Sequence, residues 1–408
     1  MKILIINHYA GSPNMGMAYR PYYLAKEWIK RGHEVVILCA DFSHLRKKNP
    51  IIKDDFEIFC EDEVRFCVVK TPAYNGNGVK RIINMFTFIF KLRLNIKKIL
   101  NIIFPDVVIA SSTYPLDNYI AHRISKRTKA QHVFEVHDLW PLSPRELGNM
   151  SKLHPFILIM QAAENFAYKH VNKVVSMLPK TLDHMAEHGL KPEKWFHIPN
   201  GIVLEDWKNF DKIPKSYSTL FKEIKQGGRK IVGYAGGHAI SNSLDTLIET
   251  AKLLKNYPDI VFVLVGDGQE KENLKSQADD MENLYFLDSI PKKSVPDLLS
   301  YFDILFIGWN KSPLYRFGIS PNKIFDYMMA EKPIIHAVEA GNDIVKEADA
   351  GISTEPQNPK AIADAIIQIM SLPEGDVKKM GEKGKKYVIR NHDYKVLAQN
   401  FINIIEKE

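Results

Sequence analysis

Short apolar runs alternate with amphipathic stretches along the whole chain, and this alternation predicts an α/β protein. Residues 2–7 form an apolar run, a loop with two glycines follows, and a helical pattern ends at Gly32 before a second apolar run at 34–38. A strand, a loop, a helix and a strand in close succession make a βαβ unit, whose two strands run parallel. Further strand-like runs in the first half lie at 106–110, 132–136 and 174–177.

The pattern restarts in the second half of the chain. A polar, lysine-rich passage at 211–230 is the expected linker region, and strand-like runs follow it at 230–235, 260–265, 284–287 and 303–307. A chain of 408 residues is too long for one ordinary core. We therefore predict two Rossmann-like, doubly wound parallel-sheet domains that face each other across a cleft, at 1–205 and 206–390, with a C-terminal helix at 391–408 that packs back on the first domain.

The segment 318–333 combines a loop, about three turns of helical pattern and the start of a strand. Ser320 and Pro321 begin the helix, so that its unpaired N–H groups and positive dipole end lie beside Lys323, which suits a phosphate. Asp326 follows one turn later, where a carboxylate can accept hydrogen bonds from the two hydroxyls of a ribose. A capped surface helix with incidental charges is the alternative.

Two other positions lie just after the carboxyl end of a predicted strand, where a doubly wound sheet binds ligands. Gly236 and Gly237 allow backbone N–H groups to approach a ligand closely, although a plain βα turn explains them equally well. His137 follows the run 132–136 and is therefore expected to line the ligand crevice, where a catalytic residue would lie. A structural histidine that is satisfied by its neighbour Asp138 is the alternative.

The composition excludes several classes of protein. With 45% hydrophobic and 25% charged residues the chain is globular, because a disordered chain has fewer apolar residues. The first apolar run is too short for a signal peptide, and no run reaches the ~18 residues of a spanning helix. The three cysteines, Cys39, Cys60 and Cys67, are odd in number and lack metal-site spacing, which favours a reducing cytoplasm without disulfides.

The charge is distributed unevenly between the two halves. Residues 1–200 contain 28 Lys and Arg against 18 Asp and Glu, a net charge of +10, whereas residues 201–408 contain 27 against 30, a net charge of −3. A basic half can face nucleic acid, an acidic polymer or an anionic membrane, and the sign alone does not choose among these partners.

Residues 79–104 concentrate this positive charge. The stretch has six basic residues and no acidic one, and large apolar side chains lie between them. This composition is typical of a helix at an anionic lipid surface. A core helix whose long cations reach the solvent is the alternative, and both interpretations can hold for different halves. Nucleic acid is disfavoured, because the stretch is aliphatic and Phe-rich without the interleaving expected for stacked bases.

Patterns that the chain lacks narrow the chemistry further. The glycines around Gly11 and Gly16 do not have the spacing of the dinucleotide fingerprint, which counts against a nicotinamide or flavin dehydrogenase. No paired Asp-x-Asp follows a strand in the predicted crevice, so we expect no metal site and a metal-independent reaction. Glu135, Asp138 and Asp326 offer no obvious facing pair of the kind that a glycosidase needs.

The motifs, in their order and spacing, resemble those of a known family of enzymes. They are similar to those of the retaining, nucleotide-sugar-dependent glycosyltransferases with the GT-B fold, in the group 1 or family 4 type, and most of all to the branch that transfers amino sugars in bacterial O-antigen and capsule assembly. The resemblance covers nearly the whole chain. The matching pieces are 1–7 with the loop 11–16, 136–141, 198–201, 233–236, 265–268 and 320–333.

The resemblance implies roles for individual residues. His137 would contact the donor sugar and help to stabilise charge at the reacting carbon, and Asp326, as the second acid of the family's Glu-x7-Glu motif, would bind the ribose. Lys323 and Arg316 would hold the leaving phosphates, and the backbone of Gly16 would approach the diphosphate. The expected donor-binding set is completed by Ile290, whose segment contacts the base, and by Gly236, Gly237, Ser320 and Asn322.

The chain departs from the family pattern at two places. The first acid of Glu-x7-Glu should stand at Gly318, where no carboxylate is present. The Arg and Lys that usually follow the first strand of the second domain are also missing, near Gly237 and Asn242. Arg316 and Lys323 are the expected substitutes for the lost positive charge.

The predicted function is a retaining transfer of a sugar, an N-acetylated hexosamine, from a UDP-sugar to a lipid-linked or saccharide acceptor in bacterial surface polysaccharide biosynthesis. No cofactor is expected besides the nucleotide-sugar donor. The expected partners are an undecaprenyl-diphosphate-linked or saccharide acceptor and the anionic inner face of the cytoplasmic membrane, where a cytoplasmic, peripheral protein would bind. A nucleotide-sugar epimerase of the same architecture and a non-catalytic nucleotide-binding subunit are the alternatives.

Overall fold

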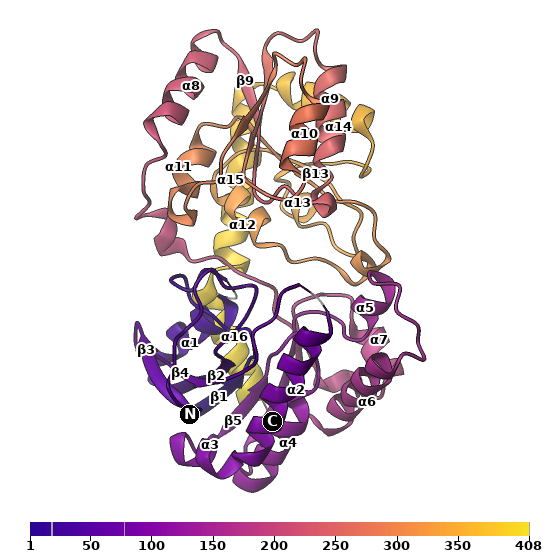
Figure 1. Cartoon of the computed structure of the whole chain (residues 1–408). Helices are drawn as coiled ribbons and strands as arrows, with labels where there is room; N and C mark the ends of the chain where they lie inside the picture. Colours follow the sequence, from indigo (N-terminus) through magenta and orange to yellow (C-terminus); the bar gives the residue numbers. More distant parts are fainter. Residues whose placement is uncertain (18, 77, 408) are drawn as a thin grey trace. The chain divides into compact units, whose positions relative to one another are not determined.

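The computed structural model describes residues 1–17, 19–76 and 78–407, and the chain divides into two compact units (Figure 1). Unit 1 contains Met1–Asn200 and Tyr394–Glu408, and unit 2 contains Gly201–Asp393. The division falls after Asn200, against the predicted boundary at 205. Glu408, the last residue of the predicted C-terminal helix, lies outside the described residues.

Unit 1 is built on a sheet in which the described residues form eight strands in the order β3-β4-β2-β1-β5-β6-β7-β8. The central strand β1 pairs in parallel with both β2 and β5, which confirms the βαβ unit predicted for the first forty residues. All neighbouring pairs are parallel except β3 and β4. The strands are β1 Lys2–Ile6, β2 Glu34–Ala40, β3 Glu57–Glu61, β4 Val64–Val69, β5 Val107–Ala110, β6 Gln131–Val136, β7 Lys173–Ser176 and β8 Trp195–His197.

The last helix of the chain belongs to unit 1, because its apolar face packs on the first helix. Trp28 of α1 donates from Nε1 to the carbonyl of Ala398 at 3.0 Å, and its ring lies 5.2 Å from that of Phe401. The helices of unit 1 are α1 Arg20–Ile29, α2 Val79–Leu94, α3 Ile96–Ile102, α4 Asp117–Thr128, α5 Leu142–Glu146, α6 Pro155–His170, α7 Leu182–Glu187, the 3-10 turn η1 Pro192–Lys194 and α16 Tyr394–Glu406.

Unit 2 contains a parallel sheet in which the described residues form six strands in the order β11-β10-β9-β12-β13-β14. Successive residues of a strand point to opposite faces, so that Ile231 and Val232 of β9 enter different core clusters. The strands are β9 Lys230–Ala235, β10 Ile260–Val265, β11 Leu284–Leu287, β12 Ile304–Gly308, β13 Ile334–Ala337 and β14 Gly351–Ser353.

Helices cover both faces of this sheet, as in a doubly wound fold (Figure 1). One face packs on α8, α11, α12, α13 and α15, and the other on α9, α10 and α14. The helices are α8 Lys215–Gln226, α9 Leu244–Leu253, α10 Lys271–Gln277, α11 Val295–Ser300, α12 Asn322–Met329, α13 Ile344–Glu347, α14 Pro359–Met370 and α15 Glu374–Asn391, with 3-10 turns η2 Leu204–Trp207, η3 Ile240–Asn242, η4 Lys292–Ser294 and η5 Pro313–Phe317.

The predicted linker at 211–230 is wrong. Most of this passage is the helix α8, whose Phe221 and Ile224 lie fully buried in the core of unit 2. These two residues are three positions apart and share one helix face, whereas the lysines that suggested a linker lie on the exposed side. The polar composition of the passage therefore reflects a solvated helix face.

The basic stretch 79–104 forms two helices, α2 and α3, which meet at Asn95. Met85, Phe88 and Leu92 of α2 are buried, as a core helix requires, while other apolar side chains of the same helix are exposed. Both interpretations of the stretch therefore apply, but to two faces of one helix. Within the described part of the chain, none of the helices combines the length and the apolar character that crossing a bilayer requires.

Gly233, in the middle of β9, gives a test of the packing in unit 2. A Cβ atom there would lie 2.0 Å from Cδ2 of the buried Phe302 ring, so Gly233→Ala should destabilise the protein by about 1–3 kcal/mol through overpacking. Urea unfolding followed by circular dichroism measures this change.

Gly375→Ala, at the start of α15, is the matched control, because nothing lies within 4 Å of its Cβ position. It should leave stability unchanged or raise it by up to about 1 kcal/mol, since alanine favours a helix. Equal stability of the two variants would contradict the close packing of Phe302 on β9.

Candidate functional site

The carboxyl edge of the unit 2 sheet brings together Gly236 and Lys323, which lie far apart in the sequence. Gly236 directly follows β9 and has a φ of 155°, a backbone conformation that favours glycine. A Cβ atom at this position would lie 2.7 Å from both Cε and Nζ of Lys323. The backbone conformation is what favours glycine here, and the flexible end of the lysine would have to move if residue 236 carried a side chain.

Tyr234 holds the ammonium group of Lys323 in place. Lys323 Nζ donates to the Tyr234 hydroxyl at 2.6 Å and lies 4.0 Å from the centre of its ring, and that hydroxyl donates to the carbonyl of Gly237 at 2.7 Å. Burial lowers the pKa of Lys323 to about 7, and no carboxylate forms an ion pair with it among the described residues. An anionic ligand that binds beside this lysine would therefore favour its charged form.

The helix α12 that carries Lys323 is fastened to the end of β9 one turn further on. The hydroxyl of Tyr327, which is buried, accepts a hydrogen bond from the backbone N–H of Ala235 at 2.9 Å. This contact and that of Lys323 lie four residues apart on the same face of the helix. They position the start of α12 beside the loop that contains Gly236 and Gly237.

Asp326 lies on the same helix in a partly buried position. Burial raises the pKa of its carboxyl to about 6, an effect that the charge of Lys292 partly opposes. Trp207 of η2 donates from Nε1 to Asp326 Oδ1 at 3.4 Å. Asp326 therefore has hydrogen-bonding capacity left for a ligand, as expected for a group that would accept from ribose hydroxyls.

The remaining predicted residues of unit 2 lie in or just before α12, in η5 and after β11. Asn322 is the first residue of α12, Ser320 precedes it by two positions, and Ile290 lies in the segment after β11, partly buried against the core. Arg316 lies in η5, where Nη1 donates to the carbonyl of Pro313 and the guanidinium covers the Phe317 ring at 4.3 Å. A shared role of Arg316 with Lys323 stays a prediction.

Gly318, where the family motif has its first acid, has a φ of 97° and a ψ of 175°. A side chain there would be strained, because this backbone conformation favours glycine. The chain turns from η5 towards α12 at this residue.

In unit 1, His137 follows β6 and lies in a network of buried polar groups. Its Nε2 is 2.9 Å from Ser111 Oγ and 3.2 Å from Glu135 Oε2, and Glu135 in turn pairs with Arg20 at 2.9 Å. Asp138 instead accepts from Ser143 Oγ and from the backbone N–H of Leu139. The partner of His137 is therefore Glu135, and the alternative that Asp138 satisfies it is wrong.

Gly16 lies in the loop after β1, at the carboxyl edge of the unit 1 sheet. It has a φ of 90°, and a Cβ atom there would come within 2.9 Å of Cβ and Cγ of Lys47. Its backbone N–H bonds to the carbonyl of Ser12 at 2.9 Å. The position requires glycine for the fold of the loop itself, and contact with a diphosphate stays a prediction.

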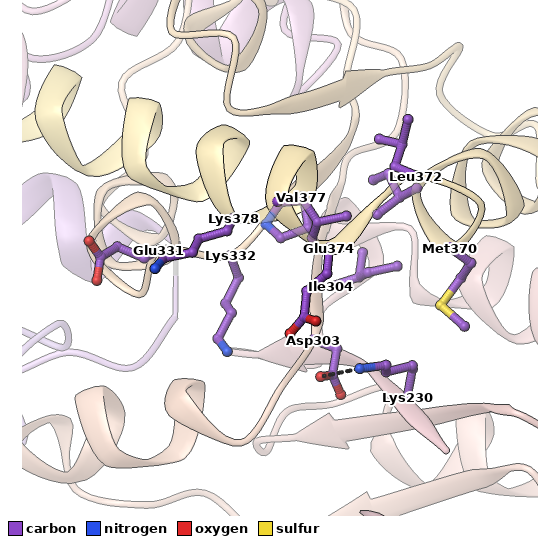
Figure 2. A pocket seen from close by; sticks show the side chains of 13 residues that line it. Lys230, Asp303, Ile304, Glu331, Lys332, Met370, Leu372, Glu374, Val377 and Lys378 are labelled. Atoms are coloured by element: carbon purple, nitrogen blue, oxygen red, sulfur yellow. Dashed lines mark ion pairs between the residues drawn. The ribbon is translucent and has the colours of Figure 1, made fainter. Parts of the chain in front are cut away.

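A cavity of about 660 Å³ lies at the opposite edge of the unit 2 sheet. Figure 2 shows the side chains that line it. It is lined by residues at the amino ends of three strands, namely Lys230 of β9, Ile304 of β12 and Pro333 before β13. Since ligands of doubly wound sheets bind at the carboxyl ends, this cavity is not where a nucleotide is expected.

Two family profiles match most of the chain. Residues 15–206 match glycosyltransferase family 4, and residues 218–387 match glycosyl transferases group 1. The chain belongs to the GT-B glycosyltransferases of this type. Among curated proteins, the glycosyltransferase is similar to WbjE of Pseudomonas aeruginosa, described as a probable glycosyltransferase, with 21% identity over 357 residues that cover 81% of this chain and 82% of WbjE.

Solved structures share its fold over the full length. HepE of Anabaena, in complex with UDP and glucose, superposes with a TM-score of 0.67 and 17% identity and covers 100% of both chains. WaaG, described as a glycosyltransferase involved in lipopolysaccharide biosynthesis, gives a TM-score of 0.64 and 15% identity, also with 100% of both chains covered. These neighbours confirm the predicted GT-B fold of two parallel-sheet domains.

Sequence reasoning did not single out the residues that hold the predicted ones in place. These residues are Tyr234 under Lys323, Trp207 beside Asp326, and Ser111 and Arg20 around Glu135. Tyr234 lies in the matching piece 233–236, but no role was predicted for its side chain. Tyr234 lies inside a strand, two residues before Gly236. A polar hydroxyl on a buried strand just before a glycine loop was the available signal.

Asp326→Asn tests the electrostatics of this edge. Because the carboxyl pKa is raised from 3.8 to about 6, the folded chain holds the proton more tightly than the unfolded chain, and stability falls as the pH rises from about 4 to about 6. The variant escapes this loss. It should be more stable than the wild type by about 1–2 kcal/mol at pH 7.5, and the difference should shrink towards zero at pH 4.5, as measured by urea unfolding.

Asp364→Asn serves as the control, since Asp364 is exposed on α14 and pairs only with Lys360. It should show no pH-dependent gain. An Asp326→Asn variant that is no more stable than the wild type at pH 7.5 would show that the buried carboxylate is fully compensated.

Proposed function

We propose that this glycosyltransferase moves an N-acetylated hexosamine from a UDP-sugar, with retention of anomeric configuration, to a lipid-linked or saccharide acceptor in bacterial surface polysaccharide biosynthesis. Membership of the family supports the reaction class. UDP as the nucleotide is supported by neighbours such as HepE, whose structure contains UDP and glucose. The surface polysaccharide pathway is supported by the likeness to WaaG.

One observation carries the proposal, the contact between Lys323 and the main chain of Gly236 beside Asp326 at the carboxyl edge of unit 2. This edge presents the amine of Lys323, the two glycines Gly236 and Gly237, and a carboxylate on one helix. The N–H group of Gly236 itself bonds to the carbonyl of Val265 at 2.9 Å, so the prediction that this N–H approaches a ligand is wrong. The lysine and the glycine loop suit a diphosphate, and the carboxylate suits a ribose. Asp326 would accept from the ribose, and Lys323 would bind the phosphates.

The reaction breaks the bond between the anomeric carbon and the phosphate oxygen of the donor and forms a bond to an acceptor hydroxyl oxygen. UDP leaves with the electron pair of the broken bond, and the proton of the acceptor hydroxyl passes to the leaving phosphate. Lys323 and Arg316 stabilise the charge that develops on the phosphates, an effect worth several kcal/mol per group in a closed site. His137 stabilises the positive charge on the sugar, and the transfer proceeds without a metal.

An exposed apolar stripe on α2 supports binding to a membrane surface. Val79, Ile83, Phe86, Phe90 and Leu94 follow each other at spacings of three or four residues, which places them on one side of the helix, and all five are exposed. Contiguous exposed apolar surface of this kind marks an interaction site. α2 is labelled in Figure 1.

Basic residues that lack an ion-pair partner in the described part of the chain flank this stripe. Among the described residues, Lys80, Arg93 and Lys97 form no ion pair, whereas Lys91 is paired with Asp55 at 2.8 Å. An apolar stripe edged by unpaired cations is complementary to an anionic lipid surface. We therefore place the protein at the inner face of the cytoplasmic membrane, where an undecaprenyl-diphosphate-linked acceptor would be found.

Two other functions lead to different products. A nucleotide-sugar epimerase converts UDP-N-acetylglucosamine without an acceptor, and a non-catalytic subunit binds UDP without turnover. Thermal-shift screening of UDP, GDP, ADP and dTDP identifies the nucleotide, and NMR of the product from the matching donor then shows epimer, free sugar or glycoside. A glycoside with inverted linkage, or loss of transfer in EDTA, would overturn the proposed mechanism.

Lys323→Met tests the phosphate-binding role. Loss of the cation should raise the dissociation constant of UDP at least tenfold and reduce transfer by about 10²- to 10³-fold. Because burial lowers the pKa of Lys323 to about 7, a bound diphosphate should raise it again, so that binding at pH 7.5 takes up protons. Calorimetry in buffers of different ionisation enthalpy measures both the affinity and the uptake.

Lys360→Met, at an exposed lysine of α14, is the matched control and should bind UDP like the wild type. The number of protons taken up on UDP binding should be smaller in Lys323→Met than in the wild type. An unchanged UDP affinity in that variant would refute the assignment of Lys323 to the phosphates.

Substitutions on α2 test the membrane surface. Sedimentation with vesicles that contain about 30% phosphatidylglycerol should retain the wild type, and neutral vesicles should not. Phe90→Ser combined with Leu94→Ser should weaken retention at least tenfold, because each buried apolar side chain contributes about 1.5–3 kcal/mol.

Leu253→Ser combined with Tyr257→Ser removes exposed apolar side chains from unit 2 and should leave retention unchanged. Arg93→Gln combined with Lys97→Gln should reduce the salt dependence of binding. Equal retention of the wild type on neutral and anionic vesicles would count against an anionic surface as the partner.

A further inference from the structure

Glu135, the residue before the last of β6, lies buried beneath His137 and contacts the side chains of Arg20, Ser111 and His137. Its Oε1 accepts from Arg20 Nε of α1 at 2.9 Å, and its Oε2 accepts from Ser111 Oγ, just after β5, at 2.6 Å. The same Oε2 is 3.2 Å from His137 Nε2. Arg20 also donates to the carbonyls of Ile198 and Pro199, so the network ties β6 to the segment that ends unit 1.

The carboxyl group of Glu135 is ionised in this network. Burial by itself would raise its pKa, but the charge of Arg20 and the contacts with His137 and Ser111 outweigh the burial and hold the pKa well below its usual range. An ionised carboxylate can only accept hydrogen bonds. The hydrogen that lies between Ser111 Oγ and Glu135 Oε2 therefore comes from the serine hydroxyl.

This assignment determines which nitrogen of His137 carries a hydrogen. Ser111 Oγ has one hydrogen, which it donates to Glu135, so it faces His137 Nε2 at 2.9 Å with a lone pair. Asn7 Nδ2 donates to the same oxygen at 3.1 Å. Nε2 thus has two acceptors, Ser111 Oγ and Glu135 Oε2, and no donor. A bare lone pair on Nε2 would repel the lone pairs of both oxygens. Nε2 therefore carries the hydrogen.

We propose that Glu135 and Ser111 are positioning residues that keep His137 protonated on Nε2 and leave Nδ1 as the nitrogen that acts on the donor sugar. The inference rests on the proposed function, in which His137 faces the sugar. His137 remains partly exposed, and no hydrogen bond engages its Nδ1 within the described residues. Glu135 would act through the histidine without touching the substrate.

The choice of tautomer decides the sign of the electrostatic effect. With the hydrogen on Nε2, a neutral ring presents the lone pair of Nδ1, the negative end of its dipole, which stabilises positive charge at the anomeric carbon or accepts from a sugar hydroxyl. The opposite tautomer would present an N–H group and oppose the same charge. The negative charge of Glu135 behind the ring reinforces the favourable orientation.

The tautomer can be measured without any substrate. Long-range ¹H–¹⁵N NMR of histidine-labelled protein at pH 8.5 should show His137 with its hydrogen on Nε2, the signal being assigned by its loss in His137→Asn. In Glu135→Gln and Ser111→Ala the signal should move towards a mixture of tautomers. A wild-type His137 with its hydrogen on Nδ1 would overturn the proposal.

Kinetics with the matching donor test the consequence. The amide of Asn overlays Nδ1 of His, and the amide of Gln overlays Nε2, so His137→Asn should retain at least tenfold more kcat than His137→Gln. Glu135→Gln should lower kcat about 10- to 100-fold with little change in KM for the donor, and it should alter the pH profile of kcat. Equal kcat in His137→Asn and His137→Gln would also overturn the proposal.

Glu164→Gln is the control for loss of a buried carboxylate, because Glu164 lies buried in unit 1 and accepts from Tyr168 at 3.0 Å away from this network. It should keep the wild-type kcat. Circular dichroism shows whether each variant is folded. If the wild type transfers no sugar at all, the proposed function fails, while the NMR result still decides the tautomer of His137.

Discussion

The passage of the Lys323 side chain over the main chain of Gly236 is the contact on which the candidate site of unit 2 depends. Any side chain at 236 would occupy the space of the lysine, and Tyr234 supplies both the ring beneath the ammonium group and the hydroxyl that binds it. Tyr327 fastens the same helix to β9 one turn later. A strand end and a helix start that are distant in sequence thus form one surface, which the hydrogen bonds of Lys323 and Tyr327 with the end of β9 hold together.

The buried ionisable groups of the two candidate regions differ in whether a nearby group of opposite charge compensates them. In unit 1 the Glu135 carboxylate is paired with Arg20 and fully hydrogen-bonded, so the network has one stable arrangement and can orient His137. In unit 2 burial shifts the pKa of Lys323 down and that of Asp326 up, and neither has an opposite charge at hand that cancels the effect. Such uncompensated groups lower stability without a ligand, and they are typical of binding sites.

Much of the fold could be predicted because a parallel strand that is covered on both faces consists of consecutive apolar residues in the sequence. The predicted runs at 230–235, 260–265 and 284–287 are β9, β10 and β11. The hairpin β3–β4 was missed, because Asp62 and Glu63 form its turn with φ of 46° and 70° and neither is the glycine or asparagine that announces such a turn. The short edge strands β8 and β14 were missed because three residues carry too little periodicity.

The sequence by itself determined the class of fold, the positions of His137 and Gly236 just after strands, and the place of Lys323 and Asp326 on one helix, because hydrophobic period and turn residues are local properties of the chain. The family followed from the resemblance of its motifs, which the family profiles confirmed. Only the tertiary structure decided that Lys323 meets Gly236, that Glu135 rather than Asp138 bonds to His137, and that the basic helix α2 has both a buried and an exposed apolar face. The physical reason is that hydrogen bonds, burial and pKa shifts depend on which distant residues pack together, and no local pattern of residues encodes that choice.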